Sequence, residues 1–153
     1  MLRGLDEGHR CQPRVLSSAI NIAMAQRLVR RLCPDCKKEV KIDDKDKKFI
    51  NGILFAIKDP AYRPQTERMW VASSCDHCRG TGFKGRIGIF EAIIMDNNIE
   101  STIIRNPSER EIRSAASPQQ ILTLSEDGIL KVLKGIISLE ELRRVVDLEL
   151  EVA

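Results

Sequence analysis

The sequence predicts a mixed α/β protein with two short strands, a metal-binding insert between them and a helical C-terminal part. The apolar runs at 26–32 and 86–94 have the length and character of buried strands. Two Cys-x-x-Cys pairs lie between these runs, and paired cysteines of this kind are typical of a zinc site. Beyond residue 96, apolar residues recur at helical spacing.

Composition indicates a globular protein without a membrane span. Of the 153 residues, 42% are hydrophobic and 31% are charged, which is enough apolar material for one or two compact units. No apolar stretch approaches the roughly 18 to 20 residues of a membrane-spanning helix, and the start of the sequence has no apolar signal-peptide core. We therefore expect a cytoplasmic protein.

Charge and aromatic content disfavour a nucleic-acid partner. The 25 Lys and Arg against 22 Asp and Glu give a net charge of only +3, and the two signs are interspersed. Aromatic residues make up 4% of the chain, which leaves little material for stacking bases.

Before the first cysteine pair, the sequence predicts a helix followed by a strand. Residues 13–25 carry apolar side chains at helical spacing, and Pro13 suits the first turn of a helix. The short apolar segment 26–32 is predicted to be a strand that runs directly into Cys33, with a helix as the alternative. Residues 1–12 are candidates for disorder.

The insert and the segment after it are predicted to add one helix and one strand. Residues 43–58 have apolar side chains at helical spacing, with Asp43 or Asp44 as a cap and an end before Pro60. After the second cysteine pair, turn glycines lead into the apolar run 86–94, which is predicted to be a buried strand.

The C-terminal part is predicted to form four short helices. Ser-x-x-Glu capping boxes begin at Ser108 and at Ser138, and Gly135 is a natural helix stop. The predicted helices cover residues 99–105, 109–116, 124–134 and 139–147.

Four of the five cysteines form the two pairs Cys33-Pro-Asp-Cys36 and Cys75-Asp-His-Cys78. Zinc takes four ligands tetrahedrally, and a two-residue spacer lets both thiolates of a pair turn toward one ion. Four thiolates leave no position for water, so the predicted site is structural. Residues 37–74 exceed the roughly 15 to 20 residues between the pairs of a compact zinc ribbon, and the helix at 43–58 would fill this insert as a small subdomain.

Other interpretations of these residues explain less. Two disulfides are disfavoured without a secretory signal, and a redox Cys-x-x-Cys would explain only one pair. His77 could replace a thiolate, but four cysteines already complete the ligand set, so we interpret it as a bystander. His9 and Cys11 have no partner spacing, and we assign them no role.

Several segments together resemble a known family. They occur in the order seen in the assembly ATPases of type II secretion and type IV pili, and the resemblance covers roughly residues 12–146. The matching segments are Ala25-Gln-Arg-Leu-Val-Arg-Arg-Leu-Cys-Pro-Asp-Cys36, Cys75-Asp-His-Cys-Arg-Gly-Thr-Gly-Phe-Lys-Gly-Arg-Ile-Gly-Ile-Phe-Glu91, Leu124-Ser-Glu-Asp-Gly128 with Lys131, Val132 and Gly135, and Ser138-Leu-Glu-Glu-Leu-Arg-Arg-Val145.

The resemblance implies that the two strands form the edge of a RecA-like sheet into which a four-cysteine zinc subdomain is inserted, with a helical subdomain following. The implied segments are 1–32 as the end of the RecA-like ATPase core, 33–78 as the zinc-binding insert, 79–95 as the last core strand and 96–153 as the C-terminal helical subdomain.

The resemblance also implies partners and cofactors. Members of this family work as hexameric rings, in which ATP turnover drives a pseudopilus or pilus through an inner-membrane platform protein. The implied partners are therefore other ring subunits and a platform protein, at a site peripheral to the inner membrane. The implied cofactors are structural Zn²⁺ and, in a longer parent protein only, ATP with Mg²⁺. Protein secretion, pilus assembly and DNA uptake share this architecture.

The sequence contains no Gly-x-x-x-x-Gly-Lys-Ser/Thr phosphate-binding loop. Since the family's catalytic elements precede the matching stretch, we expect a C-terminal portion of a motor ATPase that does not hydrolyse ATP alone, and we assign no catalytic residue. Arg86 aligns with an arginine that contacts bound nucleotide in the secretion relatives, a role that suits a guanidinium. The alternative is a surface arginine at the start of a strand.

Two other classes of protein remain as alternatives. The segment Cys75–Gly82 reproduces the Cys-x-x-Cys-x-Gly-x-Gly unit of J-domain co-chaperones, although it occurs only once, so a zinc-binding chaperone-like module is one alternative. The other is a nucleic-acid-binding module with a basic surface that includes Arg79 and Lys84, whose affinity would fall steeply with salt.

Overall fold

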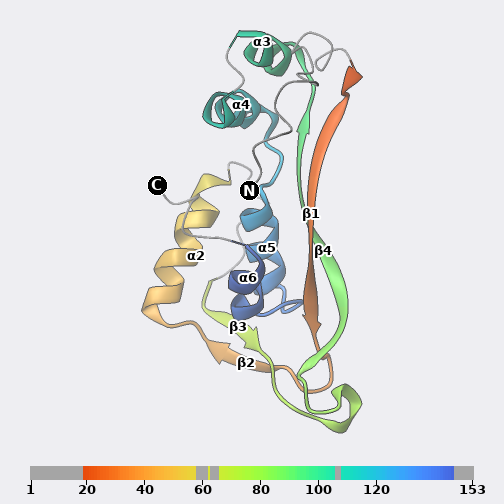
Figure 1. Cartoon of the computed structure of the whole chain (residues 1–153). Coiled ribbons are helices and arrows are strands. Elements are labelled where there is room, and N and C mark those ends of the chain that lie inside the picture. The colour runs from red at the N-terminus through yellow and green to blue at the C-terminus, as the bar shows by residue number, and fades with distance from the viewer. Residues whose placement is uncertain (1–18, 58–61, 63–65, 106–107, 147–153) are drawn as a thin grey trace, which may run out of the picture. The chain divides into compact units, whose positions relative to one another are not determined.

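The computed structural model describes residues 19–57, 62, 66–105 and 108–146. It contains both helices and strands, so the mixed α/β prediction is confirmed (Figure 1). The chain divides into two compact units. The larger unit is Met24–Glu91 with Leu122–Ala153, and the smaller unit is Met1–Ala23 with Ala92–Ile121.

A ribbon of two long strands supports the larger unit. These are β1 (Ile22–Leu32) and β4 (Phe83–Ile94), which are hydrogen-bonded to each other. The Cys33 amide donates to the Gly82 carbonyl at 2.9 Å, and the Met95 amide donates to the Asn21 carbonyl at 2.9 Å, so the strands run antiparallel. Both predicted strands are confirmed, and each begins earlier than the sequence indicated.

The prediction of a helix over 13–25 is wrong for residues 22–25, which begin β1. Their apolar spacing fits a helix and a strand alike, and pairing with β4 decides the outcome because it satisfies the backbone groups of the segment. Residues 13–18, like residues 1–12, lie outside the described part of the chain.

A second ribbon, β2 (Lys38–Lys41) and β3 (Arg68–Val71), lies within the insert and was not predicted. Its strands pair antiparallel, with Lys38 opposite Val71 and Lys41 opposite Arg68. The sequence Lys-Glu-Val-Lys of β2 has one apolar residue, so hydrophobic periodicity gives no signal there.

The predicted insert helix is confirmed as α2 (Asp44–Ala56), and its last predicted residue, 58, lies outside the described ranges. Asp43 is its N-cap, because the carboxylate accepts a hydrogen bond from the Asp46 amide at 2.7 Å. The helix buries Ile50, Ile53 and Leu54 on one face.

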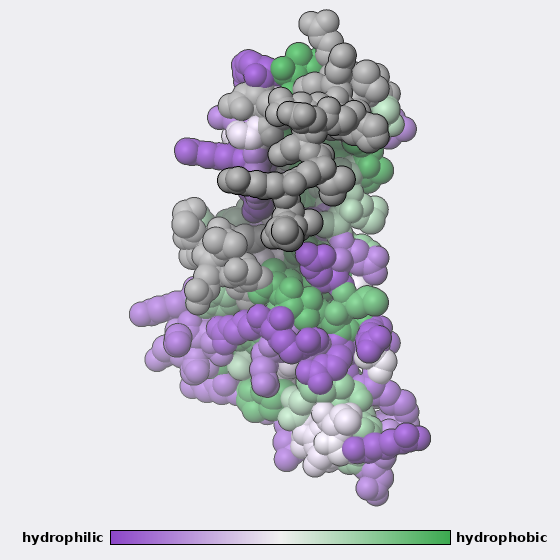
Figure 2. Space-filling model, in the orientation of Figure 1, coloured by the Kyte–Doolittle hydropathy of each residue, from purple (hydrophilic) through white to green (hydrophobic). Residues whose placement is uncertain are grey.

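One apolar core joins the insert to the C-terminal helices α5 (Leu124–Leu133) and α6 (Leu139–Val145), and α2 and α5 lie side by side (Figure 1). The core residues come from the first ribbon, the insert and both helices. They are Val29, Ile42, Ile50, Ile53, Leu54, Ile57, Ile89, Ile129, Leu130, Val132, Leu133, Ile137, Leu139 and Leu142. Hydrophilic side chains cover much of the visible surface outside it (Figure 2). Within the described ranges, no helix has both the length and the apolar character needed to cross a bilayer.

The smaller unit contains α3 (Asn97–Arg105) and α4 (Glu109–Ala116). Both helices were predicted; α4 has the predicted bounds, and α3 begins earlier than the predicted residue 99. Asp96 directly precedes α3, and hydrogen bonds from the Ile99 amide and the Gln119 side chain lower the pKa of its carboxyl group. Buried Ile99 and Ile103 face inward from α3.

The two predicted capping boxes form only in part. Ser108 and Ser138 accept hydrogen bonds from the amides of Glu111 and Glu141, so both serines cap as expected. The Glu141 side chain does not accept a hydrogen bond from the Ser138 amide, because it binds Arg30 and Arg144 instead. A complete box that was not predicted begins α5.

Candidate metal centre

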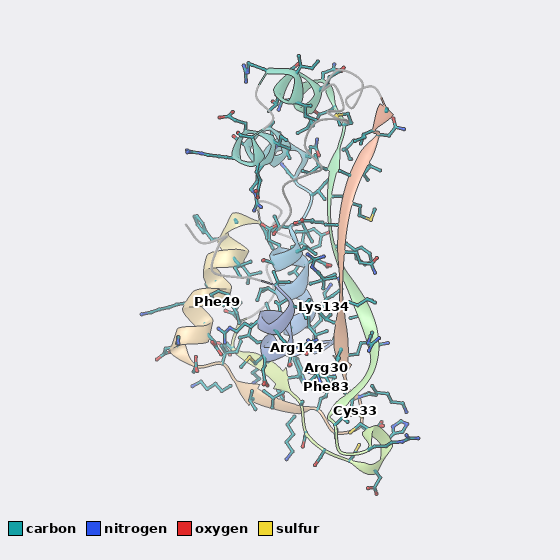
Figure 3. The ribbon with its side chains drawn as sticks, in the orientation of Figure 1. Arg30, Cys33, Phe49, Phe83, Lys134 and Arg144 are labelled. Carbon is teal, nitrogen blue, oxygen red and sulfur yellow. The ribbon has the colours of Figure 1, made fainter. Side chains whose placement is uncertain are left out.

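The two cysteine pairs lie at the ends of the ribbon strands. Cys33 directly follows β1, and the chain turns there, with the Lys37 amide donating to the Cys33 carbonyl at 3.1 Å. Cys75 precedes the short 3₁₀ helix η2 (Asp76–Cys78), which leads through a glycine-rich turn into β4. The antiparallel ribbon therefore brings the end of β1 and the start of β4, with their cysteines, to one place (Figure 3).

The four sulfur atoms form a compact cluster. The Sγ–Sγ distances are 3.9 Å for Cys33 and Cys75, 3.8 Å for Cys36 and Cys78, and 3.7 Å for Cys75 and Cys78. All four Sγ atoms lie within 4.8 Å of one another. A tetrahedral zinc ion with Zn–S bonds of about 2.3 Å separates its sulfur ligands by about 3.8 Å. The cluster therefore has the dimensions that four thiolates around one zinc ion require.

The distances do not fit disulfides. A disulfide joins its sulfur atoms at about 2.05 Å, and all four cysteines here are free. The arrangement is also closed, because Cys33 and Cys78 are buried while Cys36 and Cys75 are half-buried. Such a set could hold an ion with no position left for a substrate or a water.

Gly82 supports the cluster through its backbone. Its amide donates to Cys78 Sγ at 3.2 Å, and its carbonyl accepts from the Cys33 amide. Gly82 has a φ of +75°, and a Cβ atom there would lie 2.5 Å from the Ser73 carbonyl oxygen. A side chain at this position would therefore displace the turn that holds both cysteine pairs.

The thiols differ strongly in acidity without a cation. Burial, together with the neighbouring cysteines, raises the pKa of Cys36 to about 12. Burial also raises the pKa of Cys78, but hydrogen bonds, including the one from the Gly82 backbone, outweigh it and lower the pKa to about 6. Crowded thiols cannot all ionise alone, whereas a bound cation offsets their mutual repulsion.

The turn after α5 is hydrogen-bonded to the residues that flank the first cysteine pair. The Leu32 amide donates to the Ile136 carbonyl at 2.9 Å, and Lys37 Nζ donates to the Gly135 carbonyl at 2.7 Å. The Trp70 ring packs directly over Gly135, where a Cβ atom would lie 2.6 Å from it. This turn therefore connects the cluster to the helices.

His77 lies beside the cluster. Its Nδ1 contacts the Asp35 carboxylate, and its Nε2 contacts Lys84 Nζ. Ligand atoms of Cys33, Asp35 and His77 also lie within 4.8 Å of one another. The four cysteines form a complete tetrahedral set without the imidazole. His9 and Cys11 fall outside the described residues.

Arg86 lies near the start of β4, with its side chain exposed. Its guanidinium makes no hydrogen bond or ion pair with any residue in the described ranges. Its predicted role in nucleotide contact stays a prediction.

An ion network around the buried carboxylate of Glu141 was not predicted. Both oxygens of Glu141 accept hydrogen bonds from Arg30 and from Arg144, at 2.7 to 3.0 Å. The two arginines are labelled in Figure 3. The Arg30 guanidinium also lies 4.1 Å from the centre of the Phe83 ring, at the start of β4. The network joins α6 to both strands of the first ribbon.

Comparison with known proteins places these features in a family. A family model described as "Type II/IV secretion system protein" matches residues 8–144. The type IV pilus assembly ATPase PilB of Thermus thermophilus is 38% identical over 130 residues, which are 85% of this chain and 14% of that protein. The type IV pilus assembly ATPase TfpB of Acinetobacter baylyi is 37% identical over 138 residues, which are 90% of this chain and 22% of that protein.

A relative from protein secretion is similar to the same degree. The type II secretion system protein E of Pseudomonas aeruginosa is 36% identical over 134 residues, which are 88% of this chain and 25% of that protein. The chain thus spans a quarter or less of the length of these relatives. With the family model matched over most of its length, the chain belongs to the type II/IV secretion system protein family.

Proposed function

We propose that the chain forms the C-terminal portion of an ATPase that powers type II protein secretion or type IV pilus assembly. Its similarity to two pilus assembly ATPases and to a secretion system protein E supports this function. ATP hydrolysis, with Mg²⁺, belongs to a longer protein, because the 153 residues contain no phosphate-binding loop. In that protein the partners are other subunits of a hexameric ring and an inner-membrane platform protein, at the cytoplasmic face of the membrane.

Within this portion, Cys33, Cys36, Cys75 and Cys78 hold one structural zinc ion. The observation that carries this assignment is the cluster of four Sγ atoms at the spacing of a tetrahedral ligand set. Zinc would supply a charge-neutralising cross-link between the end of β1 and the start of β4. The protein supplies the buried surroundings and the Gly82 amide that donates to Cys78.

The ribbon and the helices are proposed to be the edge of a RecA-like sheet and a C-terminal helical subdomain. Three apolar side chains support this interpretation, because they lie exposed on the ribbon: Met24 is 62% exposed, Leu28 56% and Phe90 43%. Apolar residues of this size fit a sheet that is covered in a longer protein. The insert is proposed to extend over 33–78.

Arg86 is proposed to contact bound nucleotide in the longer protein. Its support is the exposed guanidinium, which no described residue neutralises. Changing Arg86→Gln in that protein should weaken binding of a fluorescent ATP analogue, whereas Arg110→Gln, an exposed arginine on α4, should leave it unchanged. Equal affinities for the ATP analogue in both variants and the unchanged protein would contradict the proposed role of Arg86.

The zinc content of the purified, reduced chain tests the metal site. We expect about one zinc per chain, released as four thiols become reactive. Cys75→Ser should lose the ion, while Cys11→Ser, which changes the fifth cysteine, should keep it. A metal-free chain whose thiols all react freely would overturn the zinc assignment and leave the family membership as it is.

A further inference from the structure

The two cysteine pairs touch each other through their spacer residues. Asp35 and His77 occupy the same position in their respective Cys-x-x-Cys motifs, immediately before the second cysteine. Although 42 residues apart in sequence, their side chains meet, with His77 Nδ1 against Asp35 Oδ2. The His77 side chain is 55% exposed and the Asp35 side chain is 49% exposed. The contact spans the two pairs beside the sulfur cluster.

Lys84 fixes the direction of this contact. Its Nζ lies against His77 Nε2, the other nitrogen of the ring. An ammonium group can only donate, so Nε2 is the acceptor and Nδ1 carries the proton. The imidazole then donates from Nδ1 to the Asp35 carboxylate. The imidazole therefore lies between the Lys84 side chain of β4 and the Asp35 side chain in the first cysteine pair.

The four cysteines already supply all the ligands of the proposed zinc ion, so Asp35 and His77 are not needed as ligands. Four thiolates at tetrahedral spacing complete the coordination that zinc takes in structural sites. The carboxylate and the imidazole, which also lie near Cys33, are then available to bind each other. Their contact therefore occupies no ligand position of the ion.

We propose that Asp35, His77 and Lys84 form a clasp that joins the two cysteine pairs independently of the metal. The clasp positions the four thiols around one point and so slows zinc release, because it opposes separation of the two cysteine pairs as the ion departs. Preorganisation of this kind reduces the ordering that binding requires. This inference rests on the proposed zinc site. The three residues are positioning residues and do not ligate the ion.

The test measures zinc release from the full chain to a chromogenic chelator. Asp35→Ala and His77→Ala should each release zinc about two- to five-fold faster, a size typical of a half-exposed hydrogen bond to a charged group. The double variant should be no faster than either single one, because both remove the same contact. Asp76→Asn, which changes the neighbouring exposed spacer residue, should match the unchanged chain. High salt should reduce the difference in release rate between these variants and the unchanged chain, because it screens the charges of Asp35 and Lys84.

Other outcomes separate the clasp from the zinc site. Equal release rates in all variants would overturn the clasp while the zinc site stands. A chain that holds no zinc even unchanged would overturn both. The Co²⁺-substituted protein gives a second measurement, because its absorption spectrum reports the ligand set. An altered spectrum in His77→Ala would make the imidazole a ligand and so contradict the clasp, whereas an unchanged four-sulfur spectrum is expected.

Discussion

Glu141 is the buried charge on which the first ribbon and α6 depend. Its side chain is 0% exposed, and each of its oxygens accepts hydrogen bonds from both Arg30 and Arg144. Burial disfavours the ionised carboxylate and raises its pKa. The hydrogen bonds from Arg144 and Arg30 outweigh that effect and lower the pKa from 4.5 to about 2.

Glu141 should make stability depend on pH in the acid range. A pKa lowered by folding stabilises the protein fully above the ordinary value of 4.5, and this contribution is lost as the pH falls through about 2. The shift corresponds to a contribution on the order of 3 kcal/mol. Glu141→Gln should be less stable near neutral pH and should lose this component of the acid transition, measured by urea unfolding from pH 7 to pH 2.

The control for Glu141 is its neighbour Glu140, which is exposed. Glu140→Gln should follow the unchanged protein throughout the titration. Loss of zinc in acid acts on all three proteins, so the difference between the two variants isolates the buried carboxylate. Parallel pH profiles for both variants would refute the assignment.

At the scale of single residues, local sequence spacing predicted the cysteine cluster but not the ion network of Glu141. The Cys-x-x-Cys spacing is a property of four neighbouring residues, so the sequence displays it directly. Glu141 matched a local capping box, yet Arg30, its partner, lies 111 positions away in sequence. A long-range pair of this kind leaves no signal in a single sequence.

Among the elements, β3 and the turn after α5 connect the metal centre to the helices. Trp70 of β3 packs over Gly135, and Lys37 Nζ donates to the Gly135 carbonyl and lies 5.5 Å from the Trp70 ring. Lys37 directly follows Cys36, and β2, which pairs with β3, begins at the next residue. Movement of the first cysteine pair would therefore change the surroundings of Trp70.

Zinc removal should accordingly change tryptophan fluorescence. Trp70 is the single tryptophan of the chain, so the emission reports this position alone. On chelation we expect a shift of the emission maximum to longer wavelength, because β2 and β3 loosen and water reaches the ring. The shift should be reversed by added zinc. An emission maximum that stays constant while zinc leaves would show that the turn and the metal are independent.

The elements that the sequence predicted well are those with both periodic apolar residues and a cap. The helix α2 has both, with Asp43 as its cap, and its bounds were predicted closely. The strand β2 has neither, since its four residues are mostly charged and it is held by pairing with β3. The start of β1 was predicted as helix because its pairing with β4 is not encoded in its own spacing.

At the scale of the whole molecule, the insert is part of the larger unit's core. Ile50 and Ile53 of α2 belong to the same cluster of buried residues as Ile129 and Leu142 of the C-terminal helices. Arg143 of α6 also pairs with Asp46 of α2 at 2.8 Å. The sulfur cluster thus closes a segment whose apolar side chains pack against the rest of the unit, and the proposed ion would stabilise both together.

The central claim is that four cysteine sulfurs hold one zinc ion in this unit. X-ray absorption at the zinc edge, recorded on the purified chain, tests it most directly because it counts the ligands and measures their distances. The account predicts four sulfur ligands at about 2.3 Å and no nitrogen or oxygen ligand. A first shell that contains nitrogen or oxygen, or a protein that retains no zinc to measure, would contradict it.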